Sequence, residues 1–450
     1  MMDTGKLEFD AIIVGGRAAG ATLAARLGQM GLRILLIERA RMPSPPGASC
    51  PIIYASTMAL LDEIGADEAE YARNTPPIRR MVNVGQGMDA ILRIPEAHGR
   101  DYAYAIDRAR FDGALWAHAA RQPGVTAWDG ASLIDLLWHD GAVVGALIQH
   151  EGERKSIGAE LVIGADGRFS TVARKAGAEE RDAHDEHPTT LYYAYWREVA
   201  PLDADGPAAV AYGEGDGYGY LVMDSADNTH AVAIEGRADL LDPPAGKLES
   251  YYLELLRRNT ILWSRLQHAE RVTEVRGMRK VGNLYRNPGG AGWALVGDAY
   301  HQKDPIDGQG IYDAVYTAKL LAQAIADWRA GDRSWAQALA WYDDAARAET
   351  FPMYRSTLER VRTSLYSSSP DWFNRAAGRT VARWILRDRV CQEQIGMLLT
   401  RQVPADRVMS APVVLGALLR GPLRDLSDLL DRQLREMPPV GDPRSTLERE

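Results

Sequence analysis

The feature that most constrains this chain is a glycine-rich turn between a short apolar strand and a helix, close to the N-terminus. Phe9 to Val14 predicts a buried parallel strand, and apolar residues at helical spacing predict a helix over 18–30. The turn between them reads Gly15-Gly16-Arg17-Ala18-Ala19-Gly20, and a second apolar strand over 32–37 ends at Glu38. A strand, a glycine turn, a helix and a strand in this order indicate a βαβ unit that binds a dinucleotide.

The positions of this turn contribute in different ways. Gly15 allows a tight turn, Gly20 allows the helix to pack closely on the strand, and the N–H groups at the helix start can bind a pyrophosphate. Arg17 occupies the position of the second glycine, and we expect its side chain to turn outward or to pair with the pyrophosphate. Glu38 is placed to accept hydrogen bonds from a ribose hydroxyl. The predicted cofactor-binding residues of this unit are Gly15, Arg17, Ala18, Gly20, Glu38 and Arg39.

Two further motifs each place a carboxylate after a predicted strand. The first, Gly164 to Ser170, contains Asp166. The second begins Val296-Gly297-Asp298-Ala299 and continues through Pro305 to Gly308-Gln309-Gly310 and a helix over 308–328. A carboxylate at a strand end suits hydroxyl binding, and a helix start suits stabilisation of a developing negative charge. Each motif alone is also compatible with an ordinary capped turn between a strand and a helix.

The three motifs, in this order, resemble those of the group A flavoprotein monooxygenases, whose model fold is that of p-hydroxybenzoate hydroxylase. The resemblance covers the chain from Asp10 to Trp328. It implies an α/β fold, in which a Rossmann-like FAD-binding domain carries an inserted β-sheet substrate domain and a helical C-terminal extension. The corresponding segments are 1–180 (with a small inserted β-meander) and 281–350 for the FAD-binding domain, 181–280 for the substrate sheet, 351–436 for the helical region and 437–450 for a tail.

The resemblance also implies roles for individual residues. It places the FAD pyrophosphate at Gly15, Gly20 and Asp166, and the adenosine ribose at Glu38. Gly297 and Asp298 would bind the ribityl chain, and Arg108 would lie near the FAD. Pro305 would lie on the reactive side of the flavin, with Gly308, Gln309 and Gly310 at its pyrimidine end. Pro305, Gly308 and Gly310 are therefore the predicted catalytic positions, and no residue is assigned as acid or base. His301 lies in the same motif, where a structural hydrogen-bonding role is the stronger interpretation.

The chemistry of the family implies FAD as cofactor, NAD(P)H as a transient co-substrate and O2 as oxidant. The predicted enzyme is a monooxygenase that hydroxylates or epoxidises a flat, largely apolar small molecule through a flavin C4a-hydroperoxide. The protein would supply orientation, anion stabilisation and a dry pocket. Candidates for lining that pocket are Tyr193, Tyr195, Tyr212 and Tyr220 in the predicted substrate sheet, although alternating aromatic residues on a strand more often pack in a core.

A flavin-dependent reductase or dehydrogenase of the geranylgeranyl reductase type is the main alternative. Such enzymes are similar in the N-terminal motif and around Arg108, whereas 218–223 matches their Tyr-x-Trp-x-Phe-Pro segment only at its first position. A halogenase is disfavoured, because no lysine lies between Lys6 and Lys155 and the tryptophan-rich segment of halogenases is missing. A non-enzymatic binding protein is a further alternative, and it would purify without the colour of a flavin.

Composition narrows the class of partner. The net charge of −9 and the pI near 5.6 disfavour nucleic acid. Cys50 and Cys391 provide neither a disulfide framework nor metal-ligand spacing, and we expect Cys50 to be inert. No run approaches about 18 apolar residues, so no membrane span is predicted. We expect a cytoplasmic monomer or homodimer that acts on a small organic molecule and holds no metal.

Two patterns in the C-terminal region each allow two interpretations. Arg375, Arg379, Arg383 and Arg387 recur every four residues, either as a surface for a partner or, more commonly, as arginines paired with carboxylates of neighbouring helices. The amphipathic segment 412–434 could contact a membrane or a second subunit, but such helices usually pack on their own domain.

Overall fold

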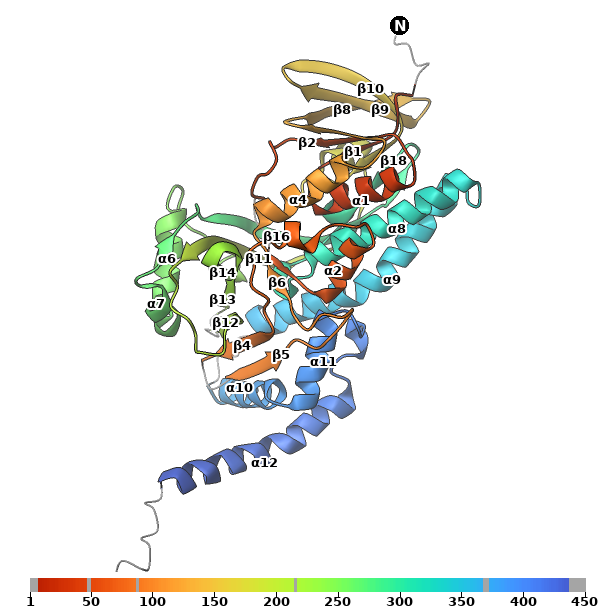
Figure 1. Ribbon diagram of the computed structural model, residues 1–450. Coiled ribbons are helices and arrows are strands. Elements are labelled where there is room, and N and C mark those ends of the chain that lie inside the picture. Colours follow the sequence, from red (N-terminus) through yellow and green to blue (C-terminus); the bar gives the residue numbers. More distant parts are fainter. Residues whose placement is uncertain (1–6, 47–49, 86–88, 214–216, 367–371, 437–450) are drawn as a thin grey trace, which may run out of the picture.

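The computed structural model describes residues 7–46, 50–85, 89–213, 217–366 and 372–436, which fold around two large β-sheets with helices packed against them (Figure 1). The first sheet carries the glycine turn and has the strand order β17-β18-β10-β1-β2-β7. β1 pairs in parallel with both β10 and β2. The strands are β1 (Phe9–Val14), β2 (Ile34–Glu38), β7 (Val125–Asp129), β10 (Glu153–Gly164), β17 (Gly289–Gly290) and β18 (Trp293–Leu295).

Three helices pack with this sheet and place the start of α1 at the carboxyl ends of its strands. α1 (Ala18–Gln29) contacts both α8 (Gly310–Ala330) and α4 (Arg108–Ala120). Because helices cover the sheet, the apolar side chains of β1 and β2 are buried, as expected for a parallel sheet. β8 (Ser132–His139) and β9 (Ala142–His150) form an antiparallel meander with the first half of β10, and α5 (Thr171–Ala176) follows.

The second sheet is mainly antiparallel and has the order β19-β16-β11-β14-β13-β12-β4-β5. Its strands are β4 (Arg80–Val84), β5 (Ala90–Arg93), β11 (Glu180–Arg197), β12 (Ala209–Gly213), β13 (Tyr218–Asp224), β14 (Thr229–Arg237), β16 (Arg276–Arg286) and β19 (His301–Gln302), with β15 (Glu270–Arg271) beside β11. α6 (Leu248–Arg258) and α7 (Thr260–Leu266) pack on one face. β4, β5 and β19 come from outside 181–280, so the second sheet also uses chain on both sides of that segment.

The C-terminal region is helical, with α9 (Trp335–Val361), a π-helical turn (Arg362–Tyr366), α10 (Trp372–Leu386), α11 (Arg389–Leu399) and α12 (Ala411–Glu436). The sequence predicts separate helices over 335–347 and 352–366, whereas the structure has one helix that contains Pro352. Tyr342 and Tyr354 on either side of the proline are both buried, and this shared packing outweighs the cost of about 3 kcal/mol for an interior proline. The predicted helix over 372–389 ends at Leu386 instead, because Asp388 caps α11 through the N–H groups of its first turn.

The polar side of α12 packs on α10 and α11. Arg383 and Arg387 pair with Asp425 and Asp428, which supports the pairing interpretation for these two arginines. The side chain of Arg375 lies outside the described residues. Figure 1 shows α12 extending away from the rest of the molecule. Six of its leucines are 50–68% exposed, namely Leu415, Leu419, Leu423, Leu426, Leu429 and Leu430, so this helix packs on its own domain mainly with its polar side. No helix in the described parts of the chain has the length and apolar character needed to span a membrane.

The remaining elements are short and connect the larger ones. They are β3 (Ile52–Ile53), α2 (Ala55–Asp62), α3 (Glu68–Tyr71), β6 (Tyr104–Ala105), and 3-10 turns at Ala226–Asn228, Gly297–Ala299, Pro305–Asp307 and Ala405–Arg407. β3 pairs with β6, which ties the loop after β2 to the start of α4. The predicted architecture, an α/β fold with an inserted β-sheet and a helical C-terminal extension, is confirmed.

Candidate active site

The glycine turn after β1 has the geometry of an anion-binding cradle. Gly15 has a φ of +106°, and a Cβ atom there would overlap the carbonyl group of Ala165. A Cβ atom on Gly20 would overlap the carbonyl oxygen of Gly15, so helix and strand approach as closely as the sequence predicts. Among the described residues, no side chain caps the start of α1 and no acidic residue lies in its first turn. The N–H groups there are therefore available to a pyrophosphate.

Arg17 adopts an arrangement that the sequence does not predict. Its guanidinium donates to Oδ2 of Asp112 at 2.8 Å and to the carbonyl and hydroxyl oxygens of Ser44 at 2.9 and 3.0 Å. Arg108 also donates to Asp112, at 3.1 Å. Asp112 is fully buried and joins the cofactor turn, the start of α4 and the loop after β2. The sequence offers only the spacing of Arg108 and Asp112 on one helix as a clue to this site.

Glu38 connects the turn to the end of β2. Its Oε2 atom accepts the N–H of Gly16 at 2.9 Å, and its Oε1 atom accepts the N–H of Ala40 at 3.1 Å. The side chain is buried, whereas Arg39 next to it is exposed. These bonds hold the Glu38 carboxylate beside the helix start, where a ribose of a dinucleotide would lie.

Asp166 and Asp298, the aspartates of the two later motifs, differ in how far their carboxylate oxygens are already hydrogen-bonded. Oδ2 of Asp166 accepts the N–H groups of Thr171 and Val172 at the start of α5, and Oδ1 accepts the hydroxyl of Ser170, the N-cap residue of this helix. Burial raises the pKa of Asp166. Asp298 is 41% exposed, and its Oδ2 lies 3.6 Å from Nε of Arg168. Asp298 is therefore the freer of the two to bind hydroxyl groups.

Gly308 and Gly310 lie at the start of α8, where the backbone is tightly enclosed on one side. Gly308 has a φ of +63°, and a Cβ atom there would lie 2.6 Å from Ile52 Cγ2 and 3.5 Å from Cys50 Sγ. A Cβ on Gly310 would meet nothing within 4 Å. Gln309 between them is buried and donates to the carbonyl of Leu399 at 3.1 Å. Burial raises the pKa of the Cys50 thiol to about 12, which keeps it protonated.

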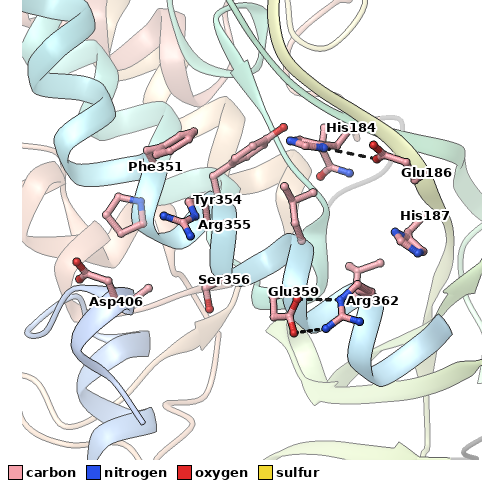
Figure 2. Close-up of a pocket in the computed structure, with 15 residues that line it drawn as sticks. His184, Glu186, His187, Phe351, Tyr354, Arg355, Ser356, Glu359, Arg362 and Asp406 are labelled. Atoms are coloured by element: carbon pink, nitrogen blue, oxygen red, sulfur yellow. Dashed lines mark hydrogen bonds and ion pairs between the residues drawn. The ribbon is translucent and has the colours of Figure 1, made fainter. Parts of the chain in front are cut away.

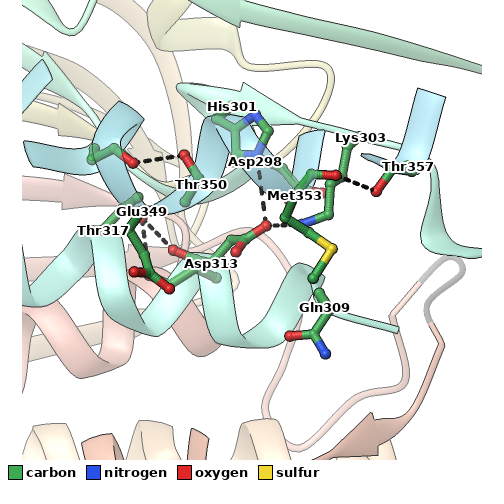
Figure 3. A network of polar contacts seen from close by, with 12 residues as sticks. Asp298, His301, Lys303, Gln309, Asp313, Thr317, Glu349, Thr350, Met353 and Thr357 are labelled. Atoms are coloured by element: carbon green, nitrogen blue, oxygen red, sulfur yellow. Dashed lines mark hydrogen bonds and ion pairs between the residues drawn. The ribbon is translucent and has the colours of Figure 1, made fainter. Parts of the chain in front are cut away.

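A buried network around Asp313 holds the first turn of α8 in place (Figure 3). Asp313 pairs with Lys303 and, at 2.9 Å, with Arg401 from the C-terminal region. These two cations hold the pKa of Asp313 well below its usual range although burial raises it, and burial lowers the pKa of Lys303. His301 stacks on Tyr285 at 4.1 Å, and burial lowers its pKa. His301 is thus a neutral core residue next to this network.

The four candidate tyrosines lie on opposite faces of the second sheet. Tyr193 and Tyr195 share the face that looks toward the first sheet, and the Tyr195 hydroxyl donates to the carbonyl of Ile106 at 3.0 Å. Tyr212 and Tyr220 are buried on the other face, under α6 and α7. The Tyr220 hydroxyl donates to Leu255 O at 2.6 Å. Of the four, only Tyr193 and Tyr195 therefore lie on the face away from α6 and α7.

Two carboxyl groups meet beside Pro305. Glu235 on β14 is hydrogen-bonded to Asp304, and both burial and the Asp304 charge raise the pKa of Glu235 well above its usual range. Asp304 accepts from the Thr189 hydroxyl and, at 3.0 Å, from the N–H of Ile306. The sequence analysis misses this pair, because neither residue belongs to a motif that signals it.

A cavity of about 840 Å³ lies behind this pair, between β11 and α9 (Figure 2). Figure 2 shows His184, Glu186 and His187 on its β11 side, Phe351 and Tyr354 on α9, and Arg362 on the π-helical turn that follows α9. Asn283 also lines it and accepts the N–H of Asp304 at 2.7 Å through its side-chain oxygen. Within the described residues, no group of three histidine, cysteine, aspartate or glutamate side chains could hold a metal ion.

The cradle, the uncapped helix starts and the motif order define a class of protein. Residues 8–350 match the family described as FAD binding domain, and the chain belongs to this family. It is an FAD-dependent oxidoreductase, and the prediction of FAD as cofactor is confirmed.

Known proteins similar to this chain include a curated reductase and two solved flavoproteins. Over 351 residues the chain is 28% identical to the digeranylgeranylglycerophospholipid reductase of Methanosphaerula palustris, an alignment that covers 76% of this chain and 82% of the relative. Its fold is similar to that of a geranylgeranyl bacteriochlorophyll reductase-like protein from Thermoplasma acidophilum (22% identity, TM-score 0.66, 94% and 98% covered). It is also similar to that of a flavin-dependent brominase (18% identity, TM-score 0.71, 94% and 99% covered).

Proposed function

We propose that this FAD-dependent oxidoreductase is a reductase that saturates carbon–carbon double bonds of an apolar, isoprenoid-like substrate. The observation that carries the proposal is the similarity to a digeranylgeranylglycerophospholipid reductase over three quarters of the chain. The similarity to a brominase, at 18% identity, supports the fold and does not indicate the reaction.

The site offers an apolar surface that suits such a substrate. Leu191, Tyr193 and Ala233 form a buried cluster on the sheet face that looks toward the cofactor turn, with Tyr195 and Leu221 packed against it. A flexible hydrocarbon chain gains free energy by leaving water for such a surface, at about 25 cal/mol per Å² of apolar area. The same surface would also accept the flat substrate of a monooxygenase. The similarity to curated reductases, and not the surface itself, therefore favours a reductase over a monooxygenase.

The proposed roles of the cofactor-binding residues follow from the geometry of the turn. The N–H groups at Ala18 and the close approach allowed by Gly15 and Gly20 would bind the pyrophosphate, and Glu38 would bind the adenosine ribose. Asp298 would bind the ribityl chain, and the start of α8 would face the pyrimidine end of the flavin. Bound FAD supplies the hydride chemistry, with NAD(P)H as the proposed electron source. The capping bonds of Asp166 favour a structural role for that residue over contact with FAD.

Turnover without oxygen tests this proposal. The FAD-loaded enzyme is mixed with NAD(P)H and digeranylgeranylglycerophospholipid in detergent micelles under anaerobic conditions. A reductase consumes NAD(P)H and yields a saturated lipid in the absence of oxygen. The monooxygenase that the sequence predicts would stop after one reduction of its flavin, and it would take up O2 in step with product once air is admitted.

A further inference from the structure

The carboxyl groups of Glu235 and Asp304 lie next to each other but differ in how many hydrogen bonds they accept. Both oxygens of Asp304 accept hydrogen bonds, from Thr189 and from Ile306. Asp304 is 1% exposed. The Oε1 atom of Glu235 is also buried, and among the described residues it has no hydrogen-bond partner. A buried carboxyl oxygen without a partner is costly, so its persistence calls for a ligand or a reacting group.

Electrostatics requires a proton on this pair. In the described parts of the chain, no lysine or arginine forms an ion pair with either carboxyl group. Lys303, next to Asp304 in the chain, pairs with Asp313, and Arg360 pairs with Asp307 at 2.5 Å. The charge of Arg360 offsets the repulsion between the two carboxylates only in part because Arg360 is paired with Asp307, and two adjacent carboxyl groups without an ion-pair partner of their own share a proton near neutral pH. Because Asp304 already accepts two hydrogen bonds, the proton lies on Glu235.

The pair lies where the reactive part of the cofactor is expected. Asp304 directly precedes Pro305, the predicted neighbour of the flavin's reactive side. Glu235 is two residues beyond Ala233 on β14 and shares its sheet face, the one with Leu191 and Tyr193. The charge of Glu235 raises the pKa of the Cys50 thiol and that of Arg108 lowers it, so Cys50 lies close to both groups. The thiol also lies beside Gly308. Glu235 thus stands between the apolar sheet face and the start of α8.

We propose that Glu235 is the proton donor of the reduction. This inference rests on the proposed function. In the step, the π electron pair of the substrate double bond forms a new C–H bond with the Glu235 proton, and the electron pair of the broken O–H bond stays on Glu235. Reduced FAD, when bound, would supply a hydride to the neighbouring carbon, so that two electrons and two hydrogen nuclei are added across the double bond in total.

Asp304 and Thr189 act as positioning residues for the donor. The Thr189 hydroxyl and the N–H of Ile306 fix Asp304, whose charge keeps the proton on Glu235 before the reaction. Once the proton has been given up, two carboxylates face each other without an ion-pair partner of their own, and this repulsion drives Glu235 to recover a proton. The groups that act on the Glu235 proton are Asp304, Asp307 from the same loop, Arg360 from α9, and the Cys50 thiol.

Infrared spectroscopy tests the proton without any turnover. The FAD-loaded wild type at pH 7 should show the carbonyl stretching band of a protonated carboxyl group, and Glu235→Gln should remove this band. Glu349→Gln, which alters another partly buried glutamate with a raised pKa on α9, should leave the band in place. Asp304→Asn removes the neighbouring negative charge, so Glu235 should lose its proton, and the band should disappear, at a lower pH than in the wild type. An identical carboxyl band in wild type and Glu235→Gln would overturn the inference.

Single-turnover kinetics test the donor role. Enzyme whose flavin has been reduced is mixed anaerobically with digeranylgeranylglycerophospholipid micelles, and reoxidation of the flavin is followed. Glu235→Gln should slow this reoxidation by about 100-fold or more and leave flavin reduction by NAD(P)H unchanged, whereas Glu349→Gln should react like wild type. Wild-type reoxidation rates in Glu235→Gln would refute the donor. If the wild type itself is not reoxidised by the lipid, the proposed function fails, and the infrared result still decides whether Glu235 holds the proton.

Discussion

Replacing Arg17 with glycine separates two possible roles of this residue. The guanidinium donates to the Asp112 carboxylate at 2.8 Å and to Ser44 at 2.9 and 3.0 Å, and its side chain is 26% exposed. Hydrogen bonds to charged groups contribute about 1.5–3 kcal/mol each. Asp112 keeps its bonds to Arg108 in the variant, so the penalty of about 3–5 kcal/mol for an orphaned buried charge does not apply.

We therefore expect Arg17→Gly to lower the free energy of unfolding of the FAD-free protein by about 1–3 kcal/mol. The affinity for FAD should change by less than about tenfold, which corresponds to 1.4 kcal/mol, because the side chain points to Asp112 and not to the helix start. Urea denaturation measures the first quantity, and titration of the FAD-free protein with FAD measures the second.

Arg41→Gly is the matched control. Arg41 lies in the loop after β2 that also contains Ser44, is 74% exposed and pairs with Asp129 at 3.1 Å. Loss of such a surface pair should cost about 0–1 kcal/mol. If Arg17→Gly instead loses more than about 100-fold in FAD affinity while its unfolding energy stays at the wild-type value, Arg17 binds the pyrophosphate and the structural reasoning is refuted.

Three further perturbations test the site. Gly20→Ala places a methyl group on the Gly15 carbonyl and should yield protein that purifies without flavin colour; a yellow variant with wild-type absorbance would contradict the close approach. Asp166→Asn weakens the cap of α5, and we expect a loss of about 1 kcal/mol in thermal denaturation with FAD content retained, whereas loss of FAD alone would make Asp166 a cofactor ligand. Asp313→Asn leaves Lys303 without its paired anion and Arg401 with only Glu349 at 3.6 Å, and it should destabilise the protein by about 3–5 kcal/mol at neutral pH. Because the pKa of Asp313 is lower in the folded state, its contribution is lost as pH falls, so the difference between wild type and variant should narrow below about pH 4; a constant difference would exclude this linkage.

The local parts of the fold are predictable from the sequence because neighbouring residues determine them. The strand predicted from Phe9 to Val14 is observed with the same bounds, and the helix that begins at Ala18 ends one residue earlier than expected, at Gln29. The tight turn at Gly15 follows from the pattern as well. The C-terminal helices are less predictable, because Pro352 and Asp388 act through packing and capping that the pattern does not reveal.

The contacts that build the site depend on residues far apart in the chain. Arg17 and Asp112 are separated by 95 positions, and the partners Thr189 and Asp304 by 115. The alternation along a strand predicts that Tyr193 and Tyr195 share a face, but it does not say which face meets the cofactor turn. Tyr212 and Tyr220 point the other way because α6 and α7 provide the core that buries them.

The most direct test of the central claim is the mass of the product formed from digeranylgeranylglycerophospholipid by the FAD-loaded enzyme with NAD(P)H, in deuterated water and without oxygen. A reductase with a solvent-exchanging proton donor yields a lipid whose added mass is hydrogen and deuterium only, with at least one solvent deuterium in each saturated bond. A product that contains an added oxygen atom, or one that forms only in air, would contradict the account.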